Sequence, residues 1–291
     1  MDLSTVANII NQVSLLFKVL DEGVRTAASI SLGNISVGNP DFFLPKVFTL
    51  IEAADPHDKY LFLNTIREII IHNPKCLKPF VPKLLPLLID QSKNEDEQIR
   101  GIVAENLGRL FIYYSQEMIF QFEASFKSES AFERATVAKS FKFGASKETD
   151  YDDLKMFVEN LIRLIGDKDI VVRRYALESL TAITHVQPQV VKQDSENMQK
   201  SAILMTKIDP SLIKEVDLGP FKHKIDDGIP IRKAAFGLID TMIEKVPEKV
   251  DCSLITEVAI KGLGDAAEEC MIQCLSIIHR LVILSPIVVI S

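Results

Sequence analysis

The chain has 291 residues, 47% of them hydrophobic and 25% charged, and a net charge of -7, which is typical of a folded globular protein. An acidic chain lacks the positive field that holds nucleic acid or an anionic membrane surface, so neither is expected as a partner. The most apolar stretch, 281–290, is about half as long as a membrane span and contains Pro286. No basic and then apolar leader is visible, so we expect neither a membrane-spanning nor a secreted protein.

Four cysteines are too few to staple a chain of this size, which favours a reducing compartment: Cys76, Cys252, Cys270 and Cys274. Cys270 and Cys274 would share one face of a helix, and with His279 they are the strongest candidate for a zinc site. His279 would lie about 140° further round the helix, and no second pair of ligands is near in sequence. We therefore interpret the two cysteines as small buried residues, and no metal is predicted.

One short pattern recurs along the chain: an acidic residue, a short gap, then Val or Ile followed by Arg and small apolar residues. Its four clear copies contain Arg25, Arg100, Arg173 and Arg232. These arginines are 75, 73 and 59 residues apart. Degenerate copies near Tyr60, Glu133 and Cys270 divide the chain into steps of 33 to 40 residues, apart from the step of 59. A period of roughly 40 residues is typical of stacked helical pairs.

Each copy is predicted to form the second helix of a pair, and the segment before it the first helix. Asp150 can cap one such first helix, because apolar residues follow it at the spacing of one helix face: Leu154, Phe157, Val158, Leu161, Ile162 and Ile165. Asn39-Pro40 and Ser285-Pro286 have the form of helix starts. The prediction is an all-α fold, a HEAT-repeat α-α superhelix (solenoid) of about seven helical pairs with one inserted β-hairpin, forming a single array over 1–291.

The repeated acidic residue and arginine are predicted to have a structural role. The acid would lie at a helix N-terminus, where the helix dipole favours negative charge, and the guanidinium would reach a neighbouring carboxylate or carbonyl. Arg25, Arg100, Arg173 and Arg232 are thus expected to form a ladder between repeats.

The 59-residue step is longer than the others by roughly 21 residues, which indicates an insertion within 186–229. Inside it, apolar and charged residues alternate around Gly219-Pro220 with a period nearer to two than to 3.6. This pattern predicts a projecting β-hairpin at about 213–226. Because an isolated two-stranded ribbon is marginally stable, it must lean on the stack or be ordered by a partner.

The hairpin is the best candidate for a binding site. Phe221 beside Lys222, His223 and Lys224 has the composition of an aromatic anchor ringed by polar groups. The residues predicted to bind a partner are Lys214, Glu215, Val216, Asp217, Leu218, Gly219, Pro220, Phe221, Lys222, His223, Lys224 and Ile225. The alternative is a surface insertion without function, which solenoid loops tolerate cheaply, and the pattern alone leaves both open.

Several stretches resemble the cullin-associated and neddylation-dissociated proteins, also described as TATA-binding-protein-interacting proteins. The resemblance rests on ASISLGNISVGNP (28–40), CLKPFV (76–81), VAENLGRL (103–110), VVRRYAL (171–177) and EVDLGPFKHKIDDGIPIRKAAF (215–236). It covers most of the chain and matches the C-terminal part of that family's long HEAT solenoid. The chain is therefore expected to be a segment or a short form of such a solenoid, without the N-terminal part that blocks neddylation.

The resemblance implies a non-enzymatic, cytoplasmic and nuclear regulator that wraps unneddylated cullin-RING scaffolds and exchanges their substrate-receptor modules. In that family the segment matching Lys214 to Ile225 is a hairpin that occupies the adaptor-binding surface of the cullin. A karyopherin-like transport receptor and a TATA-binding-protein partner are the alternative hypotheses, since transport receptors are also acidic HEAT arrays.

No catalytic or cofactor site is predicted, because the histidines are scattered and no nucleophile or metalloprotease motif is present. The glycines Gly33, Gly38, Gly101 and Gly108 lack the order of a phosphate-binding loop, and we interpret them as close-packing or helix-end positions. The basic run Lys222 to Lys224 is too short for a nucleic-acid patch. No small-molecule substrate is expected.

Overall fold

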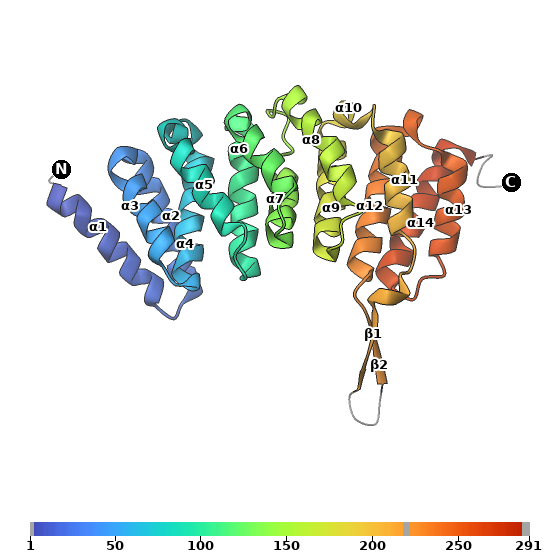
Figure 1. Ribbon diagram of the computed structural model, residues 1–291, viewed down its shortest axis with the longest axis horizontal. Coiled ribbons are helices and arrows are strands. Elements are labelled where there is room, and N and C mark those ends of the chain that lie inside the picture. The colour runs from blue at the N-terminus through green and yellow to red at the C-terminus, as the bar shows by residue number, and fades with distance from the viewer. Residues whose placement is uncertain (1–2, 218–221, 287–291) are drawn as a thin grey trace. The chain divides into compact units, whose positions relative to one another are not determined.

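The computed structural model describes residues 3–217 and 222–286 and divides into two compact units, Met1–Gly144 and Ala145–Ser291 (Figure 1). The helices of the first unit are α1 (Leu3–Leu15), α2 (Glu22–Gly38), α3 (Pro40–Ala53), α4 (Pro56–His72), α5 (Val81–Gln91), α6 (Glu97–Phe126) and α7 (Ala131–Gly144). Those of the second unit are α8 (Tyr151–Leu164), α9 (Ile170–Val186), α10 (Pro188–Val191), α11 (Ser195–Met205), α12 (Ile229–Lys245), α13 (Cys252–Gly262) and α14 (Glu268–Leu284).

Within the described residues the helices form pairs, as the repeat predicts. The pairs are α1 with α2, α3 with α4, α5 with the first part of α6, the second part of α6 with α7, α8 with α9, α11 with α12, and α13 with α14. The second helices pack on one another: α2 on α4 and α4 on α6 in the first unit, and α9 on α12 and α12 on α14 in the second. The predicted HEAT-repeat fold of about seven pairs is confirmed.

Aspartate caps set where many of these helices begin. The side chains of Asp21, Asp96 and Asp169 accept hydrogen bonds from the amides of Val24, Gln98 and Val171 at 2.9, 2.7 and 2.8 Å. Asp150 caps α8 as predicted, and α8 buries the expected apolar stripe, with Leu154, Phe157, Val158 and Leu161 fully inaccessible. Pro40 begins α3, although Asn39 makes no side-chain cap there. The helix expected after Ser285-Pro286 falls mostly outside the described residues.

A kink divides α6 between two pairs. Tyr114 has φ -135° and ψ 32°, which is not helical, and its hydroxyl donates a hydrogen bond to the Pro74 carbonyl at 2.6 Å. The rings of Phe111, Phe122 and Phe141, which come from both parts of α6 and from α7, pack on one another with centroids 5.2 to 5.6 Å apart. One continuous helical segment can therefore serve two repeats, because its two parts bury different faces.

Two of the glycines allow second helices to approach closely, as the sequence interpretation proposed. A Cβ atom at Gly33 of α2 would lie 2.6 Å from the Glu68 Cβ of α4. A Cβ atom at Gly108 of α6 would lie 2.1 Å from the Ser140 carbonyl oxygen of α7. Both approaches are closer than any side chain allows, so neither position accepts alanine without a shift of the backbone.

The hairpin follows a 3₁₀ turn (Pro210–Leu212) and consists of β1 (Ile213–Asp217) and β2 (Lys222–Asp226). This confirms the hairpin predicted at 213–226. The interval 186–229 also holds α10 and α11, and α11 is the first helix of an ordinary pair, so the departure from the repeat is confined to 206–228. The assignment of the whole chain to a single array stays a prediction. No described helix is both long and apolar enough for a membrane span.

Candidate protein-binding hairpin

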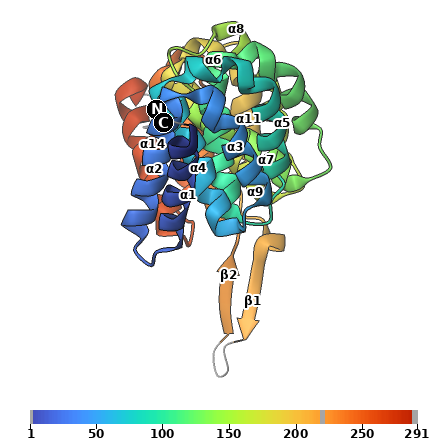
Figure 2. The same cartoon turned by 90° about the vertical axis from the view of Figure 1, so that its left-hand side faces the viewer.

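The two strands of the hairpin are antiparallel and extend beyond the ends of the helices of the second unit (Figures 1 and 2). In the register, Glu215 is paired with Lys224 and Asp217 with Lys222, so residues of opposite charge occupy opposing positions on the two strands. Opposite charges at opposing positions favour pairing of the two strands, and like charges there would oppose it. The charge pattern of the sequence is therefore compatible with the observed pairing of the ribbon, which has no core.

The structure places part of the predicted site. The described side chains are exposed: Lys214 is 68% and Ile225 is 44% exposed, and Glu215 and Lys224 are exposed as well. Val216, Asp217, Lys222 and His223 lie in the strands. The predicted residues Leu218, Gly219, Pro220 and Phe221 lie outside the described residues. The structure thus presents the stem of the predicted site, while the proposed anchor Phe221 stays a prediction.

Polar contacts fix the base of the hairpin. The amide of Asp227 donates to the Leu212 carbonyl at 3.0 Å, and the Lys214 ammonium lies 2.6 Å from the Asp227 carboxylate. The Asp209 carboxylate accepts from the amide and hydroxyl of Ser211 at 2.9 and 2.6 Å, which lowers the pKa of Asp209. The chain is therefore held both where it enters the ribbon and where it leaves it.

Arg232 of α12 ties this base to the rest of the second unit. Its Nε and Nη2 donate to the two carboxylate oxygens of Asp265 at 2.7 and 3.0 Å, and Nη2 lies 2.9 Å from Asp226 Oδ2. The side chains of Arg232 and Asp265 are only 2% and 4% exposed. Burial alone would lower the pKa of Arg232, but the bonds to Asp265 and Asp226 outweigh it and raise that pKa.

The other repeat arginines behave differently, and this corrects the expected ladder. Nη1 of Arg25 donates to the carbonyls of Val19 and Leu20, at 2.9 and 2.8 Å. Nη1 of Arg100 donates to the carbonyls of Asn94 and Glu95, at 2.7 and 2.8 Å.

Arg173 likewise donates, through Nε, to the Asp167 carbonyl. These three guanidiniums reach carbonyls, as the sequence predicts, but the carbonyls belong to the loop of their own helical pair, so these hydrogen bonds do not link repeats. The physical reason is that the free carbonyls of the preceding turn lie beside each arginine and can accept its hydrogen bonds. Arg100 also lies over the ring of Phe132 in α7, with its Cζ 4.2 Å from the ring centroid. Arg232 instead forms ion-paired hydrogen bonds with a residue of the following pair, and no local sequence signal marks that partner, Asp265, 33 residues downstream.

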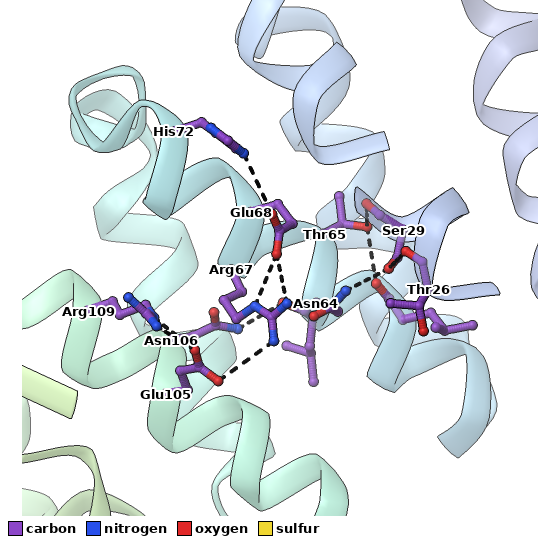
Figure 3. Close-up of polar contacts among 12 residues, drawn as sticks. Thr26, Ser29, Asn64, Thr65, Arg67, Glu68, His72, Glu105, Asn106 and Arg109 are labelled. Carbon is purple, nitrogen blue, oxygen red and sulfur yellow. Dashed lines mark hydrogen bonds and ion pairs between the residues drawn. The ribbon is translucent and has the colours of Figure 1, made fainter. Parts of the chain in front are cut away.

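A second polar cluster, which sequence reasoning missed, joins the second helices of the first unit (Figure 3). Asn64 Nδ2 of α4 donates to Ser29 Oγ of α2 at 2.6 Å, and Thr65 Oγ1 donates to the Ser29 carbonyl at 3.1 Å. Asn106 of α6 in turn donates to the Leu63 carbonyl of α4 at 2.9 Å. All these side chains are buried, so the stacked helices are joined by neutral hydrogen bonds as well as by apolar contact.

Charged side chains border this neutral cluster. Arg67 lies 2.7 Å from Glu68 and 3.8 Å from Glu105, Arg109 lies 2.9 Å from Glu105, and His72 lies 3.7 Å from Glu68 (Figure 3). Acids and bases alternate along the row, so it has little net charge and offers no ready site for a strongly charged ligand.

The cysteines occupy the positions expected for small apolar residues. Cys270 and Cys274 of α14 are fully buried, and burial raises the pKa of their thiols to about 11 and about 12. Among the described residues, one group of possible metal ligands converges: Asp55, His57 and Asp58, where α4 begins. Both carboxylates there already pair with Lys18, at 3.0 and 2.7 Å.

A cavity with a volume of about 450 Å³ lies in the second unit, between α11 and α13. Phe236 of α12 is part of its wall, together with Ile203, Leu254 and Val258, and Lys207 and Lys261 also line it. Its lining is that of a groove between stacked helices.

These features define the class of the protein: a HEAT-repeat solenoid segment with a projecting hairpin. The fold is that of the karyopherin Kap121p in its structure bound to RanGTP, with a TM-score of 0.70 over 97% of this chain and 31% of that chain, at 12% identity. A second structure of Kap121p, bound to the SUMO protease Ulp1p, gives a TM-score of 0.68 over 89% of this chain and 28% of that chain, also at 12% identity. At this identity the likeness establishes the fold alone.

Sequence comparison identifies a particular family. Residues 190–291 match the family model described as "TATA-binding protein interacting (TIP20)". The chain is 36% identical to the cullin-associated NEDD8-dissociated protein 1 of Dictyostelium discoideum over 94% of this chain and 23% of that protein. It is 31% identical to the "cullin-associated NEDD8-dissociated protein 1, C-terminal part" of Emericella nidulans, over 93% of this chain and 26% of that C-terminal part.

The resemblance to the C-terminal part of the cullin-associated and neddylation-dissociated family is therefore confirmed. The chain spans about a quarter of the length of the curated relatives it matches.

Proposed function

We propose that this chain is a non-catalytic, cullin-binding segment that regulates the assembly of cullin-RING ubiquitin ligases in the cytoplasm and nucleus. The observation that carries the proposal is the exposed hairpin at 213–226, which lies within the part of the chain that matches the family model. The ribbon has no core of its own, and its described stem residues are exposed, which suits an element completed by a partner.

The mechanism we propose is competition. The helical pairs supply a broad complementary surface for an unneddylated cullin, and the hairpin takes the surface that the substrate-receptor adaptor uses. Two ligands that overlap on one surface bind with negative coupling, so each promotes release of the other. Exchange of receptor modules follows from that coupling. Because one binding half of a longer wrap would lose avidity, the segment alone should bind the cullin weakly.

The test is a titration of the whole chain against a purified cullin N-terminal region, with and without adaptor. We expect saturable binding that adaptor reverses, and Phe221→Ala should weaken binding by on the order of 2 kcal/mol, as truncation of a central aromatic anchor usually does. The matched control is Phe120→Ala on α6, an aromatic side chain that is 83% exposed and far from the hairpin in sequence. An unchanged affinity for Phe221→Ala, or a complex indifferent to excess adaptor, contradicts the mechanism.

A second candidate is a scaffold that binds the TATA-binding protein, which the description of the matching family model favours. Capture of purified TATA-binding protein by the chain, without displacement by cullin, would support it. The third hypothesis, a karyopherin-like transport receptor, has only the fold in its favour. Nucleotide-dependent binding of a small GTPase is the result that would distinguish it.

A further inference from the structure

Arg232 stands at the same place in its repeat as the arginines that close the other loops, but its contacts differ in kind. Arg25 and Arg100 donate to carbonyls five and six residues before them, and Arg134 does the same at Ser128 and Glu129. Six residues before Arg232 is Asp226, the last residue of β2, and here the side-chain carboxylate takes the place of the backbone carbonyl. The loop contact of an ordinary repeat has thus become a charged contact with the hairpin.

The same guanidinium also holds the last helical pair. Asp265 lies in the connection between α13 and α14, and its Oδ1 accepts the amide of Ala267, the N-cap residue of α14, at 2.9 Å. Arg232 contacts Asp265 through two parallel hydrogen bonds, a geometry that fixes the orientation of both groups. A single side chain therefore joins the end of β2, the start of α12 and the start of α14.

The fit around this joint is close. A Cβ atom at Gly228 would lie 3.0 Å from Asp226 Oδ1 and 3.1 Å from Arg232 Nη1, so the neighbouring backbone approaches the ion pairs without a side chain between them. Arg232 and Asp265 are nearly inaccessible, whereas Asp226 is 20% exposed. Breaking one contact leaves a charge buried without its partner, which makes partial states costly.

We propose that Arg232 is a positioning residue that couples the orientation of the hairpin to the docking of α13 and α14 against α12. When α13 and α14 pack against α12, Asp265 binds the guanidinium of Arg232. The guanidinium in turn binds Asp226 and so fixes the direction of the hairpin. By linkage, a partner that grips the hairpin stabilises the last pair, and a ligand that displaces the last pair frees the hairpin. The purpose of the coupling rests on the proposed function, but the coupling itself exists without any partner.

The coupling can be measured on the whole chain by electron-electron spin distances within the second unit. Spin labels replace Lys224 on β2 and Lys200 on α11, both exposed, in a background of Cys76→Ala and Cys252→Ala. Cys270 and Cys274 stay unlabelled, since they are buried and their thiols remain protonated. The wild-type sequence should give one narrow distance distribution.

Three variants test the joint from different sides. Asp226→Asn removes the charge of the hairpin contact, Arg232→Met removes both contacts, and Leu281→Ala loosens α14 at a fully buried site. Each variant should broaden the distance distribution. Arg232→Lys should keep a larger narrow component than Arg232→Met. Arg100→Met, which removes the equivalent loop contact in the first unit, is the matched control and should leave the distribution narrow.

The proposal is overturned if Asp226→Asn leaves the distribution as narrow as in the control, or if Leu281→Ala loosens α14 without broadening it. Circular dichroism identifies any variant that fails to fold, and Asp226→Asn, at a partly exposed position, is the variant expected to keep its helices. Because no partner is present, the result is independent of cullin binding. Loss of cullin binding with an unchanged distance distribution would count against the proposed function and leave the coupling intact.

Discussion

The two units join their stacked helices with different kinds of buried polar groups. In the first unit, neutral side chains such as Asn64 and Thr65 link α4 to α2 by hydrogen bonds. In the second, the ion pairs of Arg232 with Asp226 and Asp265 link the hairpin, α12 and α14. Neutral groups that form a hydrogen bond cost little free energy to desolvate, and the bond adds little net stability. A buried charge costs much more to desolvate unless all its partners are in place. The charged joint lies where a projecting element must be held in one direction.

The largest effect on stability is expected from Arg232→Met. The change leaves Asp265 buried without its cation, so the free energy of unfolding of the second unit should fall by about 3–5 kcal/mol. Chemical denaturation followed by circular dichroism measures it. Adding Asp265→Asn should recover part of the loss, because the orphaned charge is removed while its side chain can still accept the Ala267 amide. A loss under about 1 kcal/mol would mean that the pair is no more than a surface contact.

The loss should also depend on pH. Burial raises the pKa of Asp265, but the hydrogen bonds from Arg232 and from the Ala267 amide outweigh it, so the pKa is lowered below the ordinary value. A carboxyl group with a depressed folded-state pKa contributes stability above its unfolded pKa and loses it as pH falls. The difference between wild type and Arg232→Met should therefore be largest near neutral pH and shrink as the solution is acidified through the carboxyl range.

These contacts mark how far sequence reasoning reached. The HEAT fold followed from a short repeated pattern, and the hairpin followed from one long interval with a period near two, because periodicity is a local property of the chain. The direction in which Arg232 points could not be predicted. Asp167 stands six residues before Arg173 just as Asp226 stands before Arg232; Arg173 donates to the Asp167 carbonyl, whereas Arg232 lies 2.9 Å from the Asp226 carboxylate.

The difference at Arg232 arises from Asp265, which approaches only when a later helical pair has stacked. For the same reason, the sequence patterns of α2 and α4 do not indicate the hydrogen bond of Asn64 with Ser29, which lies 35 residues away. Contacts between repeats depend on how repeats stack, so a period alone does not reveal them.

A smaller effect is expected in the first unit from Asn64→Ala. The change leaves the buried hydroxyl of Ser29 without its donor and should lower the free energy of unfolding by about 1–2 kcal/mol. Thermal and chemical denaturation measure it, and the double variant with Ser29→Ala should be less destabilised than the two single losses added together. Strict additivity would show that the two side chains do not interact. The contrast between neutral hydrogen bonds in the first unit and ion pairs in the second would then not hold.

The smallest effect is expected from Glu196→Gln on α11. Glu196 and Lys200 approach within 2.5 Å, a shorter distance than any ion pair of Arg232, but their side chains are 79% and 64% exposed. Water screens both charges in the folded and unfolded chain, so we expect no measurable change in stability on chemical denaturation, although the pair lowers the pKa of Glu196.

A destabilisation by Glu196→Gln comparable to that of Arg232→Met would show that distance, and not burial, sets the strength of ion pairs in this unit. The expected result is the opposite, because the penalty at Arg232 comes from the partner left behind without water. Water solvates an exposed lysine that has lost its glutamate, whereas Asp265 is buried and water does not solvate its charge. The same reasoning predicts that Lys200→Gln changes the free energy of unfolding as little as Glu196→Gln does, because removing either residue leaves no buried charge without a partner.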